Sequence, residues 1–570
     1  MKSRTSFFNF SIFKKDLTRF APVWALYSIV LVMMYLMNPY GAEESEYMAQ
    51  AVARSIPNMA LGAFVYALVC AMVLFGDLFV PRMCNALHAM PLRREGWFLT
   101  HTAAGLLFGL IPHALAALVL TIHLGEYAYL AGYWLGGVML EYLFFFGLAE
   151  LAALCAGNRL GMIAVYGIVN FGAIFVWALL NALYVPLLPG VKLMESAVEN
   201  LFPLYLLMEQ SPILVEVSYG AGERTGVEIT MGSWSIFWIL AGVGVLLGAL
   251  AVLLYRKRHL ERAADFLSVK PLAPVFLLIA TLGSGLLWYL LVQLFGVGIP
   301  GRMFFYVGMA LGFFVGLMLL ERSTRVFRMK TVAAFAVLLL IVSGSLAVTK
   351  LDPMNITGRV PMDDQIESVQ IDERIYENTR HITDSAEIAE ITRLHEQLCQ
   401  EALPGSDPFG YGTGADYTVP LQRVELHYQL TSGRELCRVY RVPVDTALAE
   451  QVQKIVFSWQ NRLGTDNLEE FVSWIDLAEI QLWDEVSGYY GERIPRDQLL
   501  PVMEAYVEDV EADRIPQGAR EFTSENAFGI SLELVVPGTG RRYHSFDIPM
   551  TATSTIQVIQ SLTGWEPGVG

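Results

Sequence analysis

A series of long apolar runs constrains the fold of this chain more than any other feature of its sequence. About 20 predominantly apolar residues cross the hydrocarbon core of a bilayer. On that criterion, spans are expected at 21–37, 56–80, 102–123, 131–155, 161–187, 233–255, 272–294, 303–320 and 331–348. With 54% hydrophobic and only 16% charged residues, the chain is too apolar for an ordinary soluble enzyme. We therefore expect a polytopic α-helical membrane protein with about nine spans.

The charges in the links between these runs predict the topology. Bases gather in the links 81–101, 158–159, 256–262 and 321–330. The alternate links hold mostly acids, although Arg302 is an exception. Because Lys and Arg mark short cytoplasmic loops, we expect a cytoplasmic N-terminus and an extracytoplasmic C-terminal region. The stretch 7–20, FFNFSIFKKDLTRF, suits an interfacial helix on the inner leaflet rather than a cleavable signal peptide.

The links also divide the chain into regions. Residues 188–232 are too polar to cross a bilayer, so they predict a small outer cap, with 195–208 as a candidate helix. The basic run at 256–262 separates a six-span block, 1–262, from a three-span block, 263–350. From 351 onward the composition is charged and mixed, which is typical of a globular region.

An internal repeat organises this C-terminal region. The first copy contains ESVQIDERIY, SAEIAEITRLHEQLC, LQRVELHYQLTSGRELCRVYRVPVD and TALAEQVQKIVFSW. The second contains LAEIQLWDEV, RDQLLPVMEAYVEDVEAD, GISLELVVPGTGRRYHSFDIPM and TATSTIQVIQSLTG. Each copy predicts a strand, a helix, a hairpin and a helix, with the hairpin turns at 432–433 and 537–540. We expect two similar α+β lobes outside the membrane, at 351–465 and 466–570.

Several kinds of chemistry are not indicated by the sequence. No GxxxxGK[ST] motif is present to hold a nucleotide's phosphates, so ATP hydrolysis by this chain is not expected. No catalytic nucleophile and base can be paired by spacing. The five cysteines show no CxxC spacing and the histidines no cluster, so no metal site is predicted. The net charge of −16, with the acids concentrated in the C-terminal region, gives no indication of a nucleic-acid partner.

Two further patterns leave alternatives open. Cys399 and Cys437 lie on the same predicted side of the membrane and could form a disulfide or remain buried thiols. Gly242 and Gly244, with Gly248, resemble a dinucleotide fingerprint superficially, but inside an apolar span they predict close helix packing instead.

Two acids in the fourth predicted span are candidates for an intramembrane polar site. Ionisable groups at such depth are costly and therefore suggest a function, such as a proton or substrate relay. The structural alternative is that the acids lie shallower than the hydropathy suggests. Glu150 lies close enough to Gly157 to reach the interface, whereas Glu141 is the deeper of the two.

The link after the second span carries a family resemblance. It reads NALHAMPLRREGWFLTH and contains an apolar residue, a proline, an aliphatic residue and two bases, at Met90, Pro91, Leu92, Arg93 and Arg94. This pattern resembles the permease subunits of type-2 (ABC-2, exporter-like) ABC transporters. The six-span block with its interfacial entry helix adds to the likeness. The closest likeness is to permeases of Gram-positive cell-envelope-stress and peptide-export systems with a large extracytoplasmic domain.

The resemblance implies a multi-pass subunit of a bacterial cell membrane. A separate ABC ATPase subunit would supply ATP and Mg²⁺ and dock between Met90 and Glu95, and a second permease subunit, identical or related, would complete the path. The substrate class would be peptides, antimicrobials or envelope components. Three alternatives remain open. The complex could transmit force or sense without transport, the chain could be a receptor without an ATPase, or Arg93 and Arg94 could only bind anionic headgroups.

Overall fold

The computed structural model describes thirteen stretches of the chain, with gaps between them, at 8–37, 45–89, 93–193, 196–220, 223–258, 260–295, 301–372, 380–401, 403–404, 421–484, 488–515, 527–536 and 540–564. The chain divides into two compact units. The first comprises Met1–Leu180 and Met194–Ser343, and the second comprises Asn181–Leu193 and Gly344–Gly570. A short segment that lies early in the sequence therefore belongs to the C-terminal unit.

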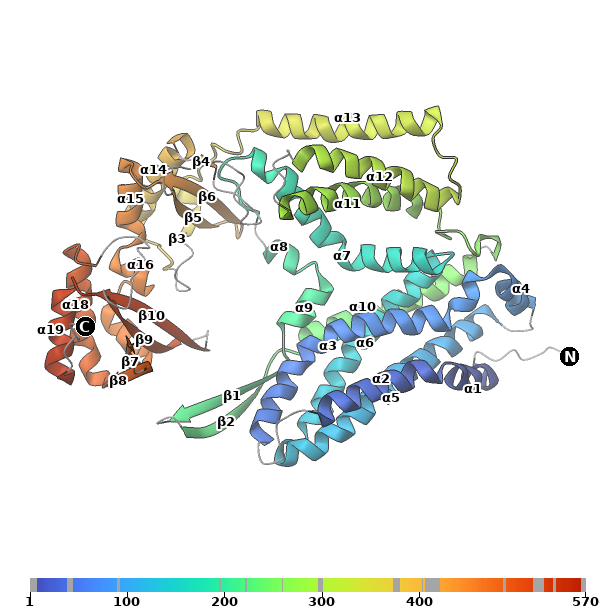
Figure 1. The fold of residues 1–570 in the computed structure, drawn as a ribbon, viewed down its shortest axis with the longest axis horizontal. Helices are drawn as coiled ribbons and strands as arrows, with labels where there is room; N and C mark the ends of the chain where they lie inside the picture. Colours follow the sequence, from blue (N-terminus) through green and yellow to red (C-terminus); the bar gives the residue numbers. More distant parts are fainter. Residues whose placement is uncertain are drawn as a thin grey trace. The chain divides into compact units, whose positions relative to one another are not determined.

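The predicted spans are present as long helices (Figure 1). Among the described residues, 8 helices are long and apolar enough to cross a membrane: α3 (Ser45–Leu74), α5 (Arg94–Leu124), α6 (Leu130–Cys155), α7 (Arg159–Leu183), α10 (Ser235–Lys257), α11 (Leu272–Leu294), α12 (Gly301–Glu321) and α13 (Met329–Leu351). The helices α1 (Phe10–Arg19) and α2 (Ala21–Leu36) meet at a bend of 55° and give a total of 9 spans if they are counted as one. The chain is thus a mostly helical protein of the polytopic type.

Two helix starts differ from the predicted spans. The second predicted span began at residue 56, but α3 begins at Ser45 and ends at Leu74. The third was expected from residue 102, but α5 begins at Arg94. Hydropathy detects only the apolar part of a helix, so polar turns that continue the same helix are missed.

Helix α6 is the centre of the first unit, where it packs against α3, α5 and α10. Small residues allow the close approach of α6 and α10. A Cβ atom on Gly244 would lie 2.5 Å from Cα of Phe144, and one on Gly248 would lie 2.9 Å from Oε2 of Glu150. A Cβ on Gly242 would meet nothing within 4 Å. The predicted packing role is therefore confirmed for Gly244 and Gly248 but not for Gly242.

The predicted cap at 188–232 contains more structure than expected. The candidate helix at 195–208 is divided into α8 (Ser196–Glu199) and α9 (Pro203–Glu209), and Pro203 begins the second of these. An antiparallel hairpin follows, formed by β1 (Ile213–Gly220) and β2 (Glu223–Met231), and it was not predicted.

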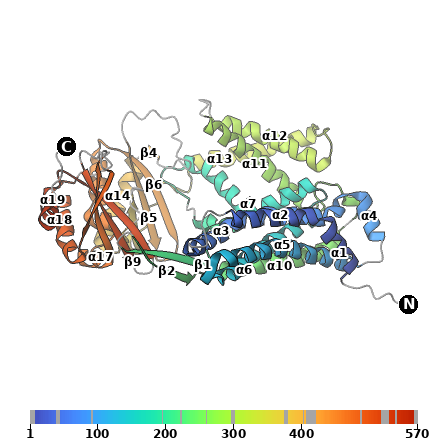
Figure 2. The same cartoon turned by 60° about the horizontal axis from the view of Figure 1, so that its bottom comes forward.

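The C-terminal unit contains two four-stranded sheets. The first has the order β3-β5-β6-β4, with β3 (Ile366–Asp372), β4 (Leu403–Pro404), β5 (Leu421–Leu430) and β6 (Glu435–Pro443). The second has the order β10-β9-β7-β8, with β7 (Ile475–Asp484), β8 (Gly488–Ile494), β9 (Ala527–Val536) and β10 (Gly540–Pro549). Each sheet has its own hydrophobic core. In Figure 2 the helices α18 (Leu499–Glu511) and α19 (Thr553–Thr563) lie together beside the strands of the second sheet.

The elements predicted by the internal repeat occur in both halves of this unit. In the first half β3 is followed by α14 (Ser385–Glu401), the β5–β6 hairpin and α15 (Ala447–Val456). In the second half β7 is followed by α18, the β9–β10 hairpin and α19. In both sheets the strand that begins the copy pairs with the first strand of the hairpin, so β3 pairs with β5 and β7 pairs with β9. The fourth strand differs, because β4 pairs with β6 whereas β8 pairs with β7.

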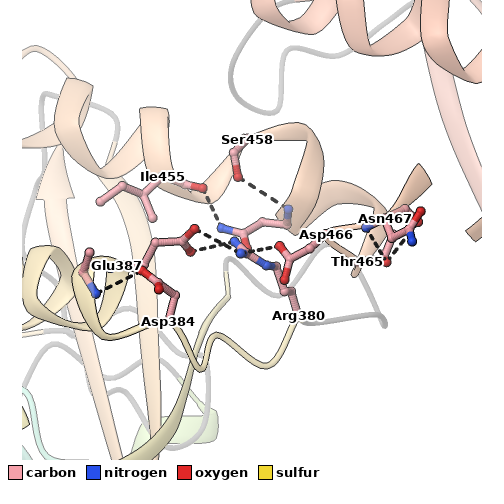
Figure 3. Close-up of polar contacts among 10 residues, drawn as sticks. Arg380, Asp384, Glu387, Ile455, Ser458, Thr465, Asp466 and Asn467 are labelled. Carbon is pink, nitrogen blue, oxygen red and sulfur yellow. Dashed lines mark hydrogen bonds and ion pairs between the residues drawn. The ribbon is translucent and has the colours of Figure 1, made fainter. Parts of the chain in front are cut away.

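A polar junction joins the two halves of the C-terminal unit (Figure 3). The guanidinium of Arg380 forms an ion pair with Glu387, at 2.9 Å, and a second ion pair with Asp466. Asp466 lies between α16 (Trp459–Leu463) and α17 (Leu468–Trp474), and the side chain of Asn467 caps the start of α17. The boundary predicted at 465–466 falls within this junction.

Candidate functional site

The link that the sequence analysis singled out forms a short surface helix. Helix α4 (Pro81–Ala89) packs on the 3₁₀ turns at Gly76–Phe79 and Leu260–Arg262. Among its described side chains only Cys84 is buried, whereas Arg82 and Met83 are exposed. Residues 90–92, the predicted Met90, Pro91 and Leu92, lie outside the described residues. Helix α4 thus leaves most of its described side chains exposed.

The three remaining residues of the predicted coupling site have different environments. Arg93 is exposed and stands at the N-cap of α5. Arg94 donates from Nη1 to backbone oxygens at the end of α10, at 3.4 Å to Tyr255 and 3.2 Å to Arg256, and at 3.2 Å to Arg258, which directly follows the helix. Glu95 accepts from Nε of Arg256 at 2.8 Å. Arg94 and Glu95 therefore fasten the start of α5 to the end of α10.

Arg258 continues this set of connections and was not singled out from the sequence. Its side chain is buried and donates from Nη1 to the backbone oxygen of Ala153 at 3.1 Å, and from Nη2 to those of Ala156 at 2.9 Å and Leu78 at 3.4 Å. The last carbonyls of a helix lack partners inside the helix and carry partial negative charge. Arg94 caps α10 in this way, and Arg258 caps α6. In the sequence, the position of Arg258 directly after an apolar span was the feature that could have indicated a role at the helix ends.

The four basic links assigned to one side of the membrane contact one another. Arg94 and Arg258 connect the first link with the third. The backbone nitrogen of Ala264 donates to the oxygen of Gly157 at 2.8 Å, which connects the second link with the segment after α10. Arg322 reaches Asp265 at 3.6 Å, which adds the fourth link. All four therefore gather at one end of the helical unit, the end that carries α4.

Glu141 is buried at the middle of α6. Its exposed fraction is 0%, and neither carboxylate oxygen has a hydrogen-bond partner among the described residues. The same stripe of α6 packs on α3, because Gly137 lies against Ile56 and Phe145 packs edge-on against Phe64. Glu141 therefore lies about midway along α6, and its depth in a membrane stays a prediction.

Glu150 lies nearer the α4 end of the same helix and is also buried. Its Oε1 accepts a hydrogen bond from the hydroxyl of Thr102 at 2.5 Å. The two acids do not form one site, because Glu150 has a hydrogen-bond partner on α5, whereas the carboxylate of Glu141, more than two helical turns away on α6, has none among the described residues. The structure does not bring them together.

A buried pair on α5 was missed in the sequence analysis. It includes His101, the residue that precedes Thr102, the partner of Glu150. Nδ1 of His101 lies 2.5 Å from Oδ2 of Asp16, and both side chains are almost fully buried. His101 was expected in the basic link, but α5 begins at Arg94 and places it inside the helix. The contact fastens the amphipathic helix α1 to α5.

The C-terminal unit contains a second cluster, on the face of the first sheet opposite its hydrophobic core. Glu425 and His427 lie two residues apart on β5, so their side chains point to the same face of the sheet. Cys437 lies directly across from His427 on β6. Nε2 of His427 lies 3.2 Å from Oε2 of Glu425 and 3.7 Å from Sγ of Cys437. Lys192 and Arg423 also form ion pairs with Glu425, the first at 2.8 Å.

These contacts shift the pKa values of two members of the cluster. Hydrogen bonds to Cys437 and Glu425 raise the pKa of His427 to about 9. Burial alone would raise the pKa of Glu425, but hydrogen bonds from His427 and Lys192, with the nearby positive charges, hold it at about 2. The carboxylate of Glu425 is therefore surrounded by the cationic side chains of Lys192, Arg423 and His427. The sequence held a signal for it, since a turn centred on Ser432 places residues 427 and 437 opposite each other.

Cys399 and Cys437 are both free thiols, so the disulfide alternative is not realised. Sγ of Cys399 lies 3.3 Å from the hydroxyl of Tyr440, whose side chain belongs to the hydrophobic core. Cys437 contacts His427 on the other face of the sheet. A sheet whose side chains alternate between faces keeps the two sulfurs apart.

The segment between α7 and α8 extends the first sheet. Val191 forms an antiparallel bridge with Arg438, and the backbone nitrogen of Val439 donates to the oxygen of Gly190 at 2.9 Å. Gly190 has a φ of +77°, and a Cβ there would lie 2.5 Å from the ring of Tyr440. This segment is thus bound to β6 by its backbone, and the ion pair of Lys192 with Glu425 adds a side-chain contact to β5.

The fold and these sites define a class of protein: a mostly helical protein of the polytopic type with an additional C-terminal unit that contains antiparallel sheets. Comparison with known protein families, with curated proteins and with solved structures finds no match that would name a particular family within that class.

Proposed function

We propose that this chain is the membrane-spanning subunit of an ATP-driven ABC transporter complex of the ABC-2 type. In this proposal a separate ATPase subunit docks on α4 and on the link that follows it, at the cytoplasmic side. The C-terminal unit lies outside the bacterial cell membrane and consists of two lobes related by duplication. The proposed cargo is peptides, antimicrobials or envelope components.

The connected arginine caps are the observation that carries this proposal. A docked ATPase subunit can move the spans only if the surface on which it docks is fastened to them. Helix α4 rests on the turn at Leu260–Arg262, Arg94 holds the end of α10, and Arg258 holds the end of α6. A push on this surface would be passed to three spans as one rigid body.

Force transmission without transport is the second candidate function. It is favoured by the segment at Gly190–Lys192, which follows α7 after the 3₁₀ turn at Val185–Leu187 and pairs with β6. A displacement of α7 would pull on a sheet of the C-terminal unit through this pairing. Transport by the purified complex in vesicles separates the two functions, since only the first predicts movement of a substrate across the bilayer.

Copurification tests the proposed ATPase contact. The native protein is tagged, purified in a mild detergent and examined by mass spectrometry and an ATPase assay. We expect a stoichiometric ATP-binding subunit with the wild type, and its loss in the double variant Arg82→Glu with Arg93→Glu. Both side chains are exposed, so the substitutions leave the packing of the spans intact.

Two features of the structure decide the controls. Arg325→Glu is the matched control, because Arg325 is an exposed base in another link. Arg94→Glu is unsuitable as a docking test, since it would break the cap on α10. If no ATP-binding subunit accompanies the wild type, the transporter proposal fails and a receptor without an ATPase is favoured.

A further inference from the structure

The ligand atoms of Glu425, His427 and Cys437 are spaced as they would be around a single metal ion. All three lie within 4.8 Å of one another, with separations of 3.2 Å and 3.7 Å for the two pairs that include His427. A tetrahedral Zn²⁺ with bonds of 2.0–2.3 Å separates its ligand atoms by about 3.3–3.8 Å. One hairpin therefore holds the three donors near the required geometry.

The chemistry of the donors selects the ion. A thiolate, an imidazole and a carboxylate are the ligand types of Zn²⁺, and three protein ligands leave a fourth position for water or another ligand. We propose that Glu425, His427 and Cys437 form a binding site for Zn²⁺ or a similar thiol-binding divalent ion. This proposal stands independently of the proposed transport function.

Access to the site is through His427. Its side chain is 29% exposed, whereas the side chain of Glu425 is only 4% exposed. Cys437 is buried as well. An ion would enter beside the imidazole and reach the thiol, and both the thiol and the imidazolium of His427 have to lose a proton on binding.

Lys192 makes the site a candidate switch. Its Nζ lies 2.8 Å from Oε2 of Glu425, the same oxygen that faces His427. A metal ion on this oxygen would repel the ammonium group. The side chain of Lys192 is 32% exposed and can turn into solvent, while Arg423 keeps its contact with Oε1. Metal binding would therefore release one of the contacts that hold Gly190–Lys192 on the first sheet.

Cobalt binding to the full-length protein tests the site. The protein carries a tag without histidines and is purified in detergent, reduced, stripped of metal and titrated with Co²⁺ at mildly alkaline pH. A thiolate ligand gives a charge-transfer absorption band. We expect one equivalent of Co²⁺ to produce this band in the wild type and in Cys399→Ser, and no band in Cys437→Ser. Absence of the band from the wild type, or its survival in Cys437→Ser, overturns the proposal.

Two further measurements keep the test decisive. Lys192→Met removes the competing charge, so Co²⁺ should bind about fivefold more tightly, and unchanged binding would overturn the competition. In the wild type, Zn²⁺ should slow the alkylation of Cys437 but not that of Cys399, measured by mass spectrometry of the peptides. Equal alkylation of Cys437 with and without Zn²⁺ overturns the site even if Cys437→Ser does not fold.

Discussion

His395 gives the C-terminal unit a built-in sensitivity to acid. The ring is fully buried, its two nitrogens each lie 3.0 Å from a tyrosine hydroxyl, of Tyr428 and Tyr440, and Cys399 also contacts Tyr440. Burial, and then the charge of Arg438, lower the pKa of His395 from 6.5 to about 3. Below pH 6.5 the unfolded chain binds a proton that the folded chain excludes. The free energy of unfolding should therefore fall by about 1.4 kcal/mol per pH unit between these two values.

Hydrogen exchange in α14 of the full-length protein measures this effect, after correction for the intrinsic pH dependence of exchange. The variant His395→Leu should be less stable at neutral pH, because two tyrosine hydroxyls lose a partner, but it should show a flatter pH dependence. An equally steep slope in the variant would assign the acid sensitivity to another group.

Glu141 allows a structural role to be separated from a functional one. Because neither of its oxygens has a hydrogen-bond partner among the described residues, Glu141→Met should leave the melting temperature in detergent unchanged or raise it by a few degrees. Glu150→Met, which removes the bond from Thr102, should lower it. A stable Glu141→Met variant that loses activity would identify the acid as functional, whereas a large loss of stability would show a structural role.

The close approach of α6 and α10 predicts a position-specific effect of volume. Gly244→Leu should lower the melting temperature strongly or prevent insertion, because its side chain would meet the backbone of Phe144. Gly242→Leu lies two residues away, where a Cβ meets nothing within 4 Å, and should be tolerated. Thermal unfolding of both variants in detergent checks the prediction, and similar losses in the two would argue against this helix pairing.

At the scale of helices and strands, the sequence was sufficient to predict those elements whose signal is local. The helices follow from long apolar runs, and the hairpin at Ser432 follows from alternation around a turn. The roles of Arg94 and Arg258 were not predictable, because they depend on which helix ends meet, and hydropathy contains no information on helix pairing. The same base can bind a headgroup, a partner or a helix end. Only the contacts of Arg94 assign it to the end of α10.

For the whole molecule, the repeat predicted the order of elements but not how the chain is partitioned. Matching segments in the two copies indicate the same strands and helices, because each copy has to bury its own core. The assignment of Asn181–Leu193 to the C-terminal unit had no comparable signal. Its pairing with β6 joins residues that are far apart in the sequence, and a short stretch around Gly190 has too few residues to show a strand pattern.

This pairing yields a prediction for the complete complex, which rests on the proposed function. If the ATPase subunits move α7, trapping them with ATP and vanadate should change hydrogen exchange in β5 and β6 of the wild type. Gly190→Val would abolish the pairing, because valine disfavours a φ of +77° and would clash with Tyr440. ATP hydrolysis should continue in this variant while the change in β5 and β6 disappears. Gly172→Val, on α7 where a Cβ meets nothing within 4 Å, should retain both. A change that persists in Gly190→Val would show that another path carries the force.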